Sequence, residues 1–133
     1  MKITTKGRYA LIIMLDLANN YESNKYISLK DISNKTSISM KYLEKLMLNL
    51  NKSDYFVSLR GKDGGYKLKY PPEHYKIGDI LKSAEENTNV ADCVSKECPN
   101  KKNCLTFSIW DDLNNLIQDY LDNKTLEDYI GRN

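Results

Sequence analysis

The 133-residue chain is poor in histidine, proline and glycine, of which it contains one, three and six. The single histidine has no companion for acid–base chemistry, and we find no nucleophile paired with a base, no phosphate-binding loop and no pair of acids. These absences argue against an enzyme. Internal repeats and low-complexity tracts are also missing, so a composition of 41% hydrophobic and 29% charged residues predicts one compact domain with an extension.

Long hydrophobic runs are absent as well. The apolar stretch at residues 10–15 is followed by Asp16, Asn19 and Asn20, and no small-residue cleavage site comes after it. We therefore expect neither a signal peptide nor a membrane span, and we expect a cytoplasmic protein. In that reducing compartment, clustered cysteines more often bind metals or take part in redox chemistry than form structural disulfides.

Cysteine is scarce but clustered. Cys93, Cys98 and Cys104 are the three cysteines of the chain, and they lie within a dozen residues of one another. An odd number of cysteines cannot all pair within one chain, and thiolates on a short polar loop suit a soft metal or an iron–sulfur cluster. The loop therefore predicts a sensor, whose output must lie elsewhere in the chain.

The formal net charge of +2 hides an uneven distribution. Residues 1–70 carry 13 Lys and Arg against 6 Asp and Glu, whereas residues 71–133 carry 7 against 12. A basic half beside an acidic half indicates that the first half meets phosphates. Solvated surface lysines are the alternative, and the position of the charges on the predicted helices favours the first interpretation.

The basic half begins with two predicted helices. Residues 6–20 form an apolar helix whose hydrophobic positions cover most of its circumference, so we expect it to be buried on two sides. Ser28 and Asp31 have the spacing of a capping box, which opens a short helix that ends near Lys35.

A third helix follows after a turn at residues 36–38. Ser39 can cap this helix, which is predicted over residues 40–52. Its apolar residues follow the i, i+3, i+4, i+7 spacing, namely Leu43, Leu46, Met47 and Leu50, and Lys41, Lys45 and Lys52 lie opposite. Two short helices joined by a three-residue turn, the second basic on its outer side, are typical of a helix-turn-helix.

A β-hairpin is predicted directly after these helices. Residues 56–60 and 66–70 alternate between apolar and polar side chains, and the glycine-rich residues 61–65 separate them. In this position a hairpin with a basic tip is a wing, and Arg60 is expected to enter the minor groove because narrow minor grooves attract arginine. An ordinary surface hairpin is the alternative.

The second half predicts a short helix at residues 77–82, the cysteine loop at 87–103 and a long helix at 105–122. A broad apolar stripe runs along the long helix, formed by Phe107, Ile109, Trp110, Leu113, Leu116, Ile117, Tyr120 and Leu121. Such a stripe needs a partner, either its own domain or a second subunit. A last short helix is expected at residues 125–128.

The predicted fold is thus mainly α-helical with a small β-hairpin. We expect residues 1–72 to form a winged helix-turn-helix DNA-binding domain, and residues 73–133 to contain the sensor loop and the long helix with its apolar stripe.

Three stretches of the sequence point to a known family. They are MKITTKGRYA at residues 1–10, ISMKYLE at residues 38–44 and RGKDGGY at residues 60–66. Together they resemble the IscR-type iron–sulfur regulators and their cysteine-metabolism relatives, the CymR type, over nearly the whole chain. The resemblance implies a homodimeric winged-helix transcription factor that binds double-stranded DNA, in which the helix at residues 105–122 crosses to its counterpart.

The same resemblance implies which residues contact DNA. Those that would face the major groove are Ser39, Met40, Lys41, Tyr42, Glu44 and Lys45. Arg60 would belong to the wing, and Lys62 lies at its tip. The lysines would supply salt-dependent affinity through phosphates, while Ser39, Tyr42 and Glu44 could address base edges. Glu44 has an alternative role as an exposed acid that pairs with nearby lysines.

The cysteines indicate the branch of the family. IscR-type members hold a cluster with three cysteines, which Cys93, Cys98 and Cys104 match to within one residue of spacing, whereas CymR-type members generally lack them. The resemblance therefore implies an iron–sulfur cluster, with 2Fe–2S favoured over 4Fe–4S. His74, the single histidine, lies far from the loop in sequence and is interpreted as a surface residue.

The fourth ligand is the point of departure. IscR-type members supply a histidine three residues after the last cysteine, and Phe107 stands there in this chain. Asp111, Asp92 or Glu97 could supply an oxygen, as could a small external thiol, and such a labile corner suits a sensor. Related regulators that respond to nitric oxide use three cysteines with a carboxylate from the N-terminal region. In this chain Arg8 occupies that position, so this correspondence fails.

Several alternatives stay open. Zinc held by three cysteines and an oxygen is the nearest, followed by metal-free or redox-active thiols. A CymR-like regulator would respond to thiol redox state or to a protein partner from cysteine or cluster biosynthesis. An iron–sulfur carrier would need the cysteines but not the basic helix-turn-helix.

Overall fold

The computed structural model of the chain describes residues 2–84, 86–94 and 98–132. Its α-helices are α1 (Thr5–Asn19), α2 (Leu29–Thr36), α3 (Met40–Leu50), α4 (Ile77–Ser83) and α5 (Phe107–Asn123). Strands β1 (Phe56–Leu59) and β2 (Gly65–Leu68) form an antiparallel hairpin. Short 3-10 turns lie at Asn51–Ser53, Pro72–His74, Asp92–Val94, Lys101–Asn103 and Leu126–Tyr129. The predicted mainly α-helical fold with a winged helix-turn-helix is confirmed.

Some predicted boundaries were wrong by one or two residues. Helix α3 ends at Leu50 because the chain tightens there into the 3-10 turn Asn51–Ser53. Helix α5 begins at Phe107 rather than at residue 105, and the last short helix is a 3-10 turn at Leu126–Tyr129 that begins with a capping box at Thr125. Helix ends often tighten or fray, since their terminal backbone groups lack partners within the helix.

Helix α1 is the centre of the hydrophobic core. Its buried residues include Ala10, Ile13, Met14 and Leu17, each with at most 1% of its surface exposed. Helix α3 packs on it through Leu43, Leu46, Met47 and Leu50, which are the apolar positions that the helical spacing predicted. This packing leaves the opposite side of α3 free to face solvent.

The same core continues past residue 72. Ile77, Ile80 and Leu81 of α4 and Leu126 near the C-terminus all belong to the cluster of buried residues around α1. Because these side chains share one core with α1 and α3, a shift of α4 would change the packing of the helix-turn-helix.

The hairpin is anchored to the loop between α1 and α2. Tyr66 in β2 exchanges two backbone hydrogen bonds with Ile27, each 2.8 Å long. Gly65 has a positive φ of 150°, and a Cβ there would clash with the Ile27 backbone, so this close crossing requires glycine. The wing is therefore fixed at its base, and the bridge to Ile27 was not predicted from the hairpin pattern.

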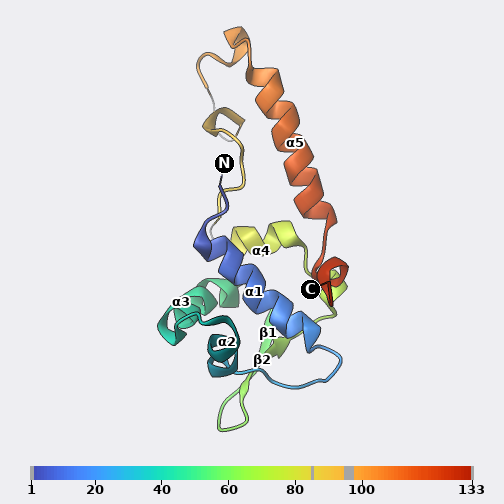
Figure 1. Cartoon of the computed structure of the whole chain (residues 1–133). Helices are drawn as coiled ribbons and strands as arrows, with labels where there is room; N and C mark the ends of the chain where they lie inside the picture. Colours follow the sequence, from blue (N-terminus) through green and yellow to red (C-terminus); the bar gives the residue numbers. More distant parts are fainter. Residues whose placement is uncertain (1, 85, 95–97, 133) are drawn as a thin grey trace.

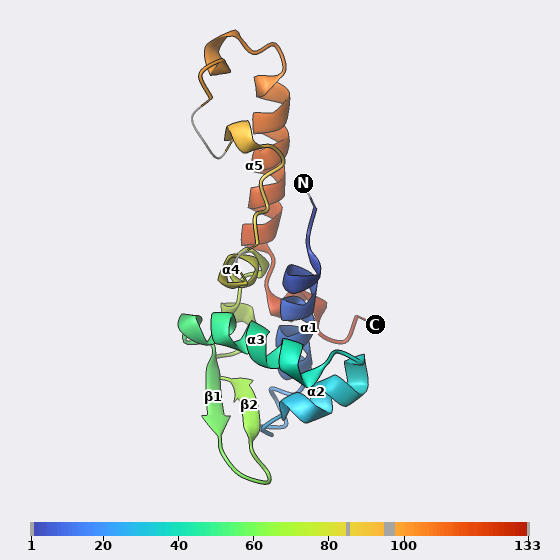
Figure 2. The same cartoon turned by 90° about the vertical axis from the view of Figure 1, so that its left-hand side faces the viewer.

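The cysteine loop and α5 form an arm that projects from the helical body (Figure 1). The wing lies at the opposite end of the molecule, and the view turned by 90° places α3 across the body with the hairpin beside it (Figure 2). None of the described helices is both long and apolar enough to cross a membrane.

Candidate DNA interface and cysteine loop

Helix α3 begins at a well-formed N-cap. Oγ of Ser39 accepts a hydrogen bond from the backbone N–H of Tyr42 at 3.2 Å. Such a cap supplies a partner for one of the free N–H groups in the first helical turn. The turn before it places Ser37 in the left-handed region, at φ 62°, which sets the angle between α2 and α3.

Most of the predicted DNA-contacting residues lie on the solvent side of α3 and at the wing tip. The exposed ones are Ser39, Met40, Lys41, Glu44, Lys45, Arg60 and Lys62. Their side chains can therefore reach a duplex that lies along α3, as base and phosphate contacts require.

Tyr42 differs from these residues because it is half-buried. Its ring meets the ring of Tyr9 edge to face, with centroids 5.7 Å apart and planes at 84°. Tyr9 belongs to α1, so this contact ties the first turn of α3 to the start of the central helix. Aromatic pairs of this geometry add to the stability gained by burial alone.

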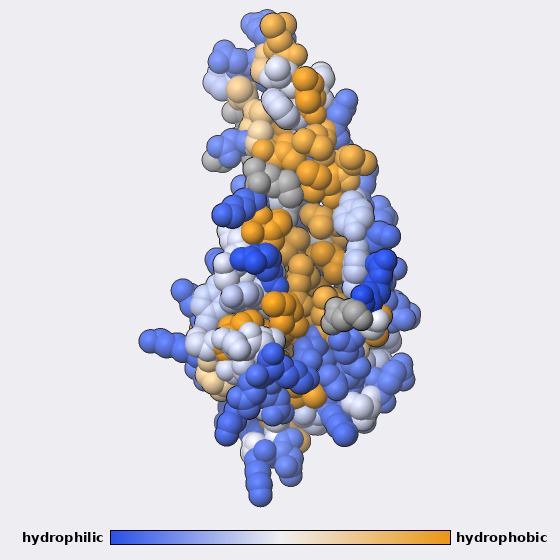
Figure 3. Space-filling view, in the orientation of Figure 1, coloured by the Kyte–Doolittle hydropathy of each residue, from blue (hydrophilic) through white to orange (hydrophobic). Residues whose placement is uncertain are grey.

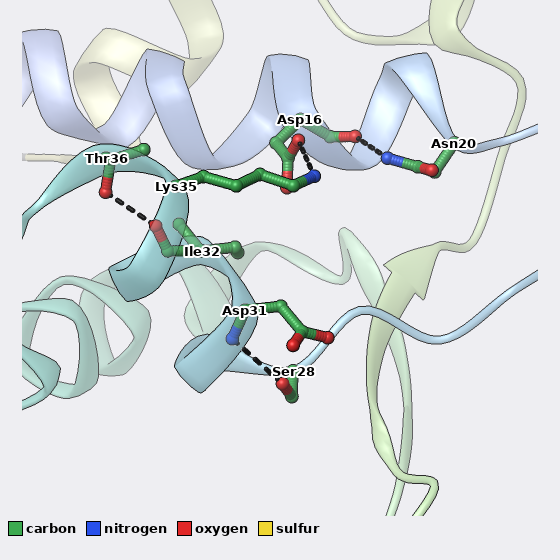
Figure 4. A network of polar contacts seen from close by, with 7 residues as sticks. All are labelled: Asp16, Asn20, Ser28, Asp31, Ile32, Lys35 and Thr36. Atoms are coloured by element: carbon green, nitrogen blue, oxygen red, sulfur yellow. Dashed lines mark hydrogen bonds and ion pairs between the residues drawn. The ribbon is translucent and has the colours of Figure 1, made fainter.

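A salt bridge fixes α2 against α1 (Figure 4). Nζ of Lys35 lies 2.9 Å from Oδ1 of Asp16, and Asn20 Nδ2 donates to the Asp16 carbonyl at 2.8 Å. At the other end of α2, Ser28 Oγ accepts from the Asp31 N–H at 3.0 Å, as the capping pattern predicted. The salt bridge thus links the C-terminal end of α2 to α1, and the Ser28 cap closes the N-terminal end of α2.

A polar hollow between the wing tip and the start of α2 was missed by sequence reasoning. It has a volume of about 490 Å³, and its lining includes Lys25, Lys30 and Lys62. Only Lys62 was expected to contact DNA. The other two come from the α1–α2 loop and from α2, and no local pattern showed that the wing would approach them.

The three cysteines are free thiols on the arm. Cys93 and Cys98 are half-buried, whereas Cys104 is exposed. Among the described residues, no three Cys, His, Asp or Glu side chains lie close enough together to hold a metal ion. The donor chemistry suits a soft metal or a cluster, but the loop must rearrange before all three thiolates can bind one.

Cys104 lies beside the start of α5. Its Sγ is 3.6 Å from Oγ1 of Thr106, and the same oxygen accepts a hydrogen bond from Trp110 Nε1 at 3.2 Å. The Thr106 hydroxyl can therefore turn its hydrogen toward sulfur. Hydrogen bonding from its side chain, followed by its backbone, lowers the pKa of the Cys104 thiol below its ordinary value.

Phe107, the candidate fourth ligands and His74 lie in different parts of the chain. Phe107 opens α5, and Nζ of Lys101 lies over its ring at 4.7 Å from the centroid. Asp111 is half-buried one helical turn later, Asp92 is exposed next to Cys93, and Glu97 lies outside the described residues. His74 stacks on Tyr70, with centroids 4.4 Å apart, in the turn that follows the wing.

On one side of α5, polar side chains bond to the segment that precedes the cysteines. Asn114 Oδ1 accepts from the Val90 N–H at 3.0 Å, and Gln118 Nε2 donates to the Thr88 carbonyl at 3.2 Å. Among the described residues, no strand pairs with Thr88 or Val90, and these amides supply hydrogen-bond partners for their backbone groups. The alignment of this segment along α5 was not predicted.

The apolar side of α5 faces outward. Ile109, Leu113, Leu116 and Tyr120 are between 40% and 68% exposed. Toward the C-terminal end of α5 lies an apolar groove of about 580 Å³, which is lined by Ile3, Leu11, Ile77, Leu81, Leu116, Ile117, Tyr120 and Leu121. A hydrophobic band runs along the arm and into the body (Figure 3).

Residues 3–132 match the family model Rrf2, which is described as an iron-dependent transcriptional regulator. The chain belongs to the Rrf2 family. This Rrf2 chain is 38% identical to the transcriptional regulator IscR of Vibrio campbellii, over 100% of this chain and 79% of the relative. It is 40% identical to a helix-turn-helix regulator of Haemophilus influenzae, over 99% of this chain and 88% of the relative.

Solved structures of the Rrf2 family have the same fold. CymR, described as the global cysteine regulator of Bacillus subtilis, superimposes with a TM-score of 0.83 and 33% identity, covering 100% of this chain and 98% of that one. IscR of T. potens superimposes with a TM-score of 0.77 and 33% identity, covering 97% and 85%. The chain is thus a DNA-binding transcriptional regulator and not an enzyme, and the resemblance to IscR and CymR is confirmed.

Proposed function

We propose that this Rrf2 regulator binds DNA as a homodimer and that groups bound at its three cysteines modulate that binding. The observation that carries the proposal is the arrangement of one polypeptide with three free thiols on an arm and an exposed basic helix α3 on the body. Such an arrangement separates a signal site from a DNA site.

Recognition would use α3 and the wing. Lys41, Lys45 and Lys62 would contact phosphates, and Ser39, Met40, Tyr42 and Glu44 would meet base edges in the major groove. Arg60, exposed at the end of β1, would enter the minor groove.

The second subunit would cover the outward side of α5. Exposed apolar bands of this kind mark interaction sites, and a symmetric pair of α5 helices would bury the same side chains on both copies. Dimerisation would also supply two recognition helices, which a near-palindromic site requires at a spacing of about one duplex turn, roughly 34 Å.

The group at the cysteines would be an iron–sulfur cluster, with 2Fe–2S favoured. Cys93, Cys98 and Cys104 would hold it, and a carboxylate oxygen from Asp111 is the candidate fourth ligand, because Phe107 has no donor atom. A cluster supplies a redox-active and oxygen-sensitive centre. Zinc is the lesser alternative.

A CymR-like mode is the second candidate. Among the described residues, the three cysteines do not lie close enough together to form a metal site. The fold also superimposes on that of CymR over almost its full length. In this mode, thiol oxidation or a protein partner from cysteine or cluster biosynthesis would control DNA binding without a cluster.

Anaerobic purification followed by visible absorption and by iron, sulfide and zinc analysis separates these candidates. Iron and sulfide in equal amounts, with absorption in the visible region, support the cluster. Zinc at one per chain without sulfide would overturn it. DNA binding that persists unchanged when all three cysteines are replaced by serine favours control by a partner protein.

A further inference from the structure

Glu86 makes a long-range contact that caps the central helix. It follows α4 and begins the segment that leads to the cysteine loop. Its Oε2 accepts a hydrogen bond from Thr4 Oγ1 at 2.6 Å and from the Gly7 backbone N–H at 3.0 Å. Thr4 and Gly7 are the N-cap residue and the third residue of α1.

The start of α1 has no such cap of its own. The first turn of α1 contains no Asp or Glu, and within the described chain the Thr4 side chain accepts no hydrogen bond from the helix. A carboxylate favours the positive end of a helix and provides an acceptor for its free N–H groups. Glu86 therefore supplies what a local N-cap residue would supply elsewhere.

The absence of a side chain at Gly7 makes room for this contact. Gly7 is a buried residue of α1, and a Cβ built at this position would overlap Oε2 of Glu86. A helix normally gains from alanine in place of glycine. Close approach of the Glu86 carboxylate gives glycine a physical reason at this position.

On one side, the contact is connected to the cysteine loop. Two residues after Glu86, Thr88 is 7% exposed and bonds to Gln118, and Val90 bonds to Asn114, which is also 7% exposed. Cys93 lies three residues beyond Val90. Hydrogen bonds thus hold the segment between Glu86 and Cys93 along α5. A movement of the cysteine loop would therefore be transmitted to Glu86, as it would not be through a flexible linker.

On the other side, the contact is connected to the recognition helix. Tyr9 lies two residues after Gly7 in α1, and its ring packs against that of Tyr42 in the first turn of α3. Ala10, in the next position, is fully buried in the core. A shift at the start of α1 would therefore change the position of Tyr42.

We propose that Glu86 is a positioning residue that couples the cysteine loop to α3. When the loop changes shape to bring its thiols together, Glu86 moves relative to Thr4 and Gly7, and the start of α1 carries the change through Tyr9 to Tyr42. This inference rests on the proposed function, since it takes DNA binding and a change at the thiols as its two ends.

The test compares DNA affinity in two thiol states. The probe is a duplex selected from a random-sequence pool by the wild-type protein, and the states are free thiols and thiols loaded by anaerobic reconstitution with iron and sulfide, with metal content measured. Loading should change the wild-type affinity by at least about fivefold, the lower end of typical couplings between sites. In Glu86→Ala, the change should fall below about twofold.

Gly7→Ala supplies a second route to the same loss. The added methyl group displaces the Glu86 carboxylate, so Gly7→Ala should lose the coupling as Glu86→Ala does, and the double variant should lose no more than either. Glu22→Ala removes an exposed acid of the α1–α2 loop and should respond as the wild type. Hydrogen exchange at the Gly7 amide should differ between thiol states in the wild type but not in Glu86→Ala.

The outcomes separate this inference from the function beneath it. A residue that only stabilised the fold would weaken DNA binding equally in both states, and an unchanged ratio in Glu86→Ala would overturn the role of Glu86 alone. A wild-type ratio of one would overturn control by the cysteines together with the coupling. Failure of the wild type to select any duplex would contradict the proposed function itself.

Discussion

Two serines occupy equivalent positions in the helix-turn-helix. Ser28 Oγ caps α2 through the Asp31 N–H, and Ser39 Oγ caps α3 through the Tyr42 N–H. Both hydrogen bonds join residues three apart, which is why the sequence pattern located them. The two sites differ in what lies beyond the cap, since Ser39 is also proposed to meet DNA.

Replacing either serine with alanine should lower the free energy of unfolding by about 1 kcal/mol, the usual cost of a lost N-cap. Urea unfolding followed by circular dichroism measures this loss. Ser39→Ala should also reduce discrimination between the selected duplex and a scrambled one, whereas Ser28→Ala should leave it nearly unchanged. Equal losses of discrimination would show that Ser39 acts only through helix stability.

Lys45 and Glu44 are neighbours on α3 with different expected roles. Lys45→Gln should weaken binding to all duplexes alike and reduce the slope of log affinity against log salt by about one, because one phosphate contact is lost. Glu44→Gln should instead alter the preferred base at one position of the site. Lys82→Gln on α4 is the control for a lysine away from α3. A Lys45→Gln slope equal to that of the control would contradict phosphate contact.

Helix α5 has two distinct faces. Asn114 and Gln118 bond to the loop of the same chain, while Leu113 and Leu116 face outward. The hydrophobic spacing predicted a stripe in need of a partner and left open whether the partner was its own domain. The structure divides the stripe, because its lower end packs against α4 and its outward side stays exposed.

Leu116→Asp should convert the proposed dimer to a folded monomer. The side chain is 68% exposed in the single chain, so the added charge costs little there, but it would be buried without a partner in a dimer. Light scattering measures the mass, and circular dichroism checks the fold. Asn115→Asp adds the same charge at the adjacent exposed position and should remain dimeric. A dimeric Leu116→Asp variant would contradict the proposed interface.

The cysteine arm and the DNA-binding body are joined by contacts between distant parts of the chain. The Glu86 carboxylate reaches Gly7, 79 residues away in sequence. Phe107 is the first residue of α5 and Asp111 follows one turn later. This end of α5 lies far from α3 (Figure 1). We therefore expect the stability of the proposed cluster and DNA recognition to respond to separate substitutions at the two ends of the molecule.

Phe107→His should lengthen the lifetime of a reconstituted cluster in air, because it supplies a nitrogen donor three residues after Cys104. The decay of visible absorption measures the lifetime. Phe107→Leu controls for the loss of the aromatic contact with Lys101. If Phe107→His decays at the rate of Phe107→Leu, the fourth ligand does not come from this position.

Local interactions account for what could be predicted. The caps at Ser28 and Ser39, the apolar side of α3, the hairpin and the clustered cysteines all depend on residues a few positions apart, and each was predicted from spacing alone. Helix ends were less certain, because the choice between α and 3-10 geometry at Asn51 depends on small differences in terminal hydrogen bonding.

Spacing along the chain was thus enough to predict the fold class, the helix-turn-helix and a loop with three thiols. The contacts by which Glu86 caps α1, Tyr9 supports Tyr42, and Asn114 and Gln118 hold the loop against α5 became visible only in the folded chain. Helical and strand periodicities act between neighbouring residues, whereas these contacts arise because the packed core fixes where distant segments of the chain meet.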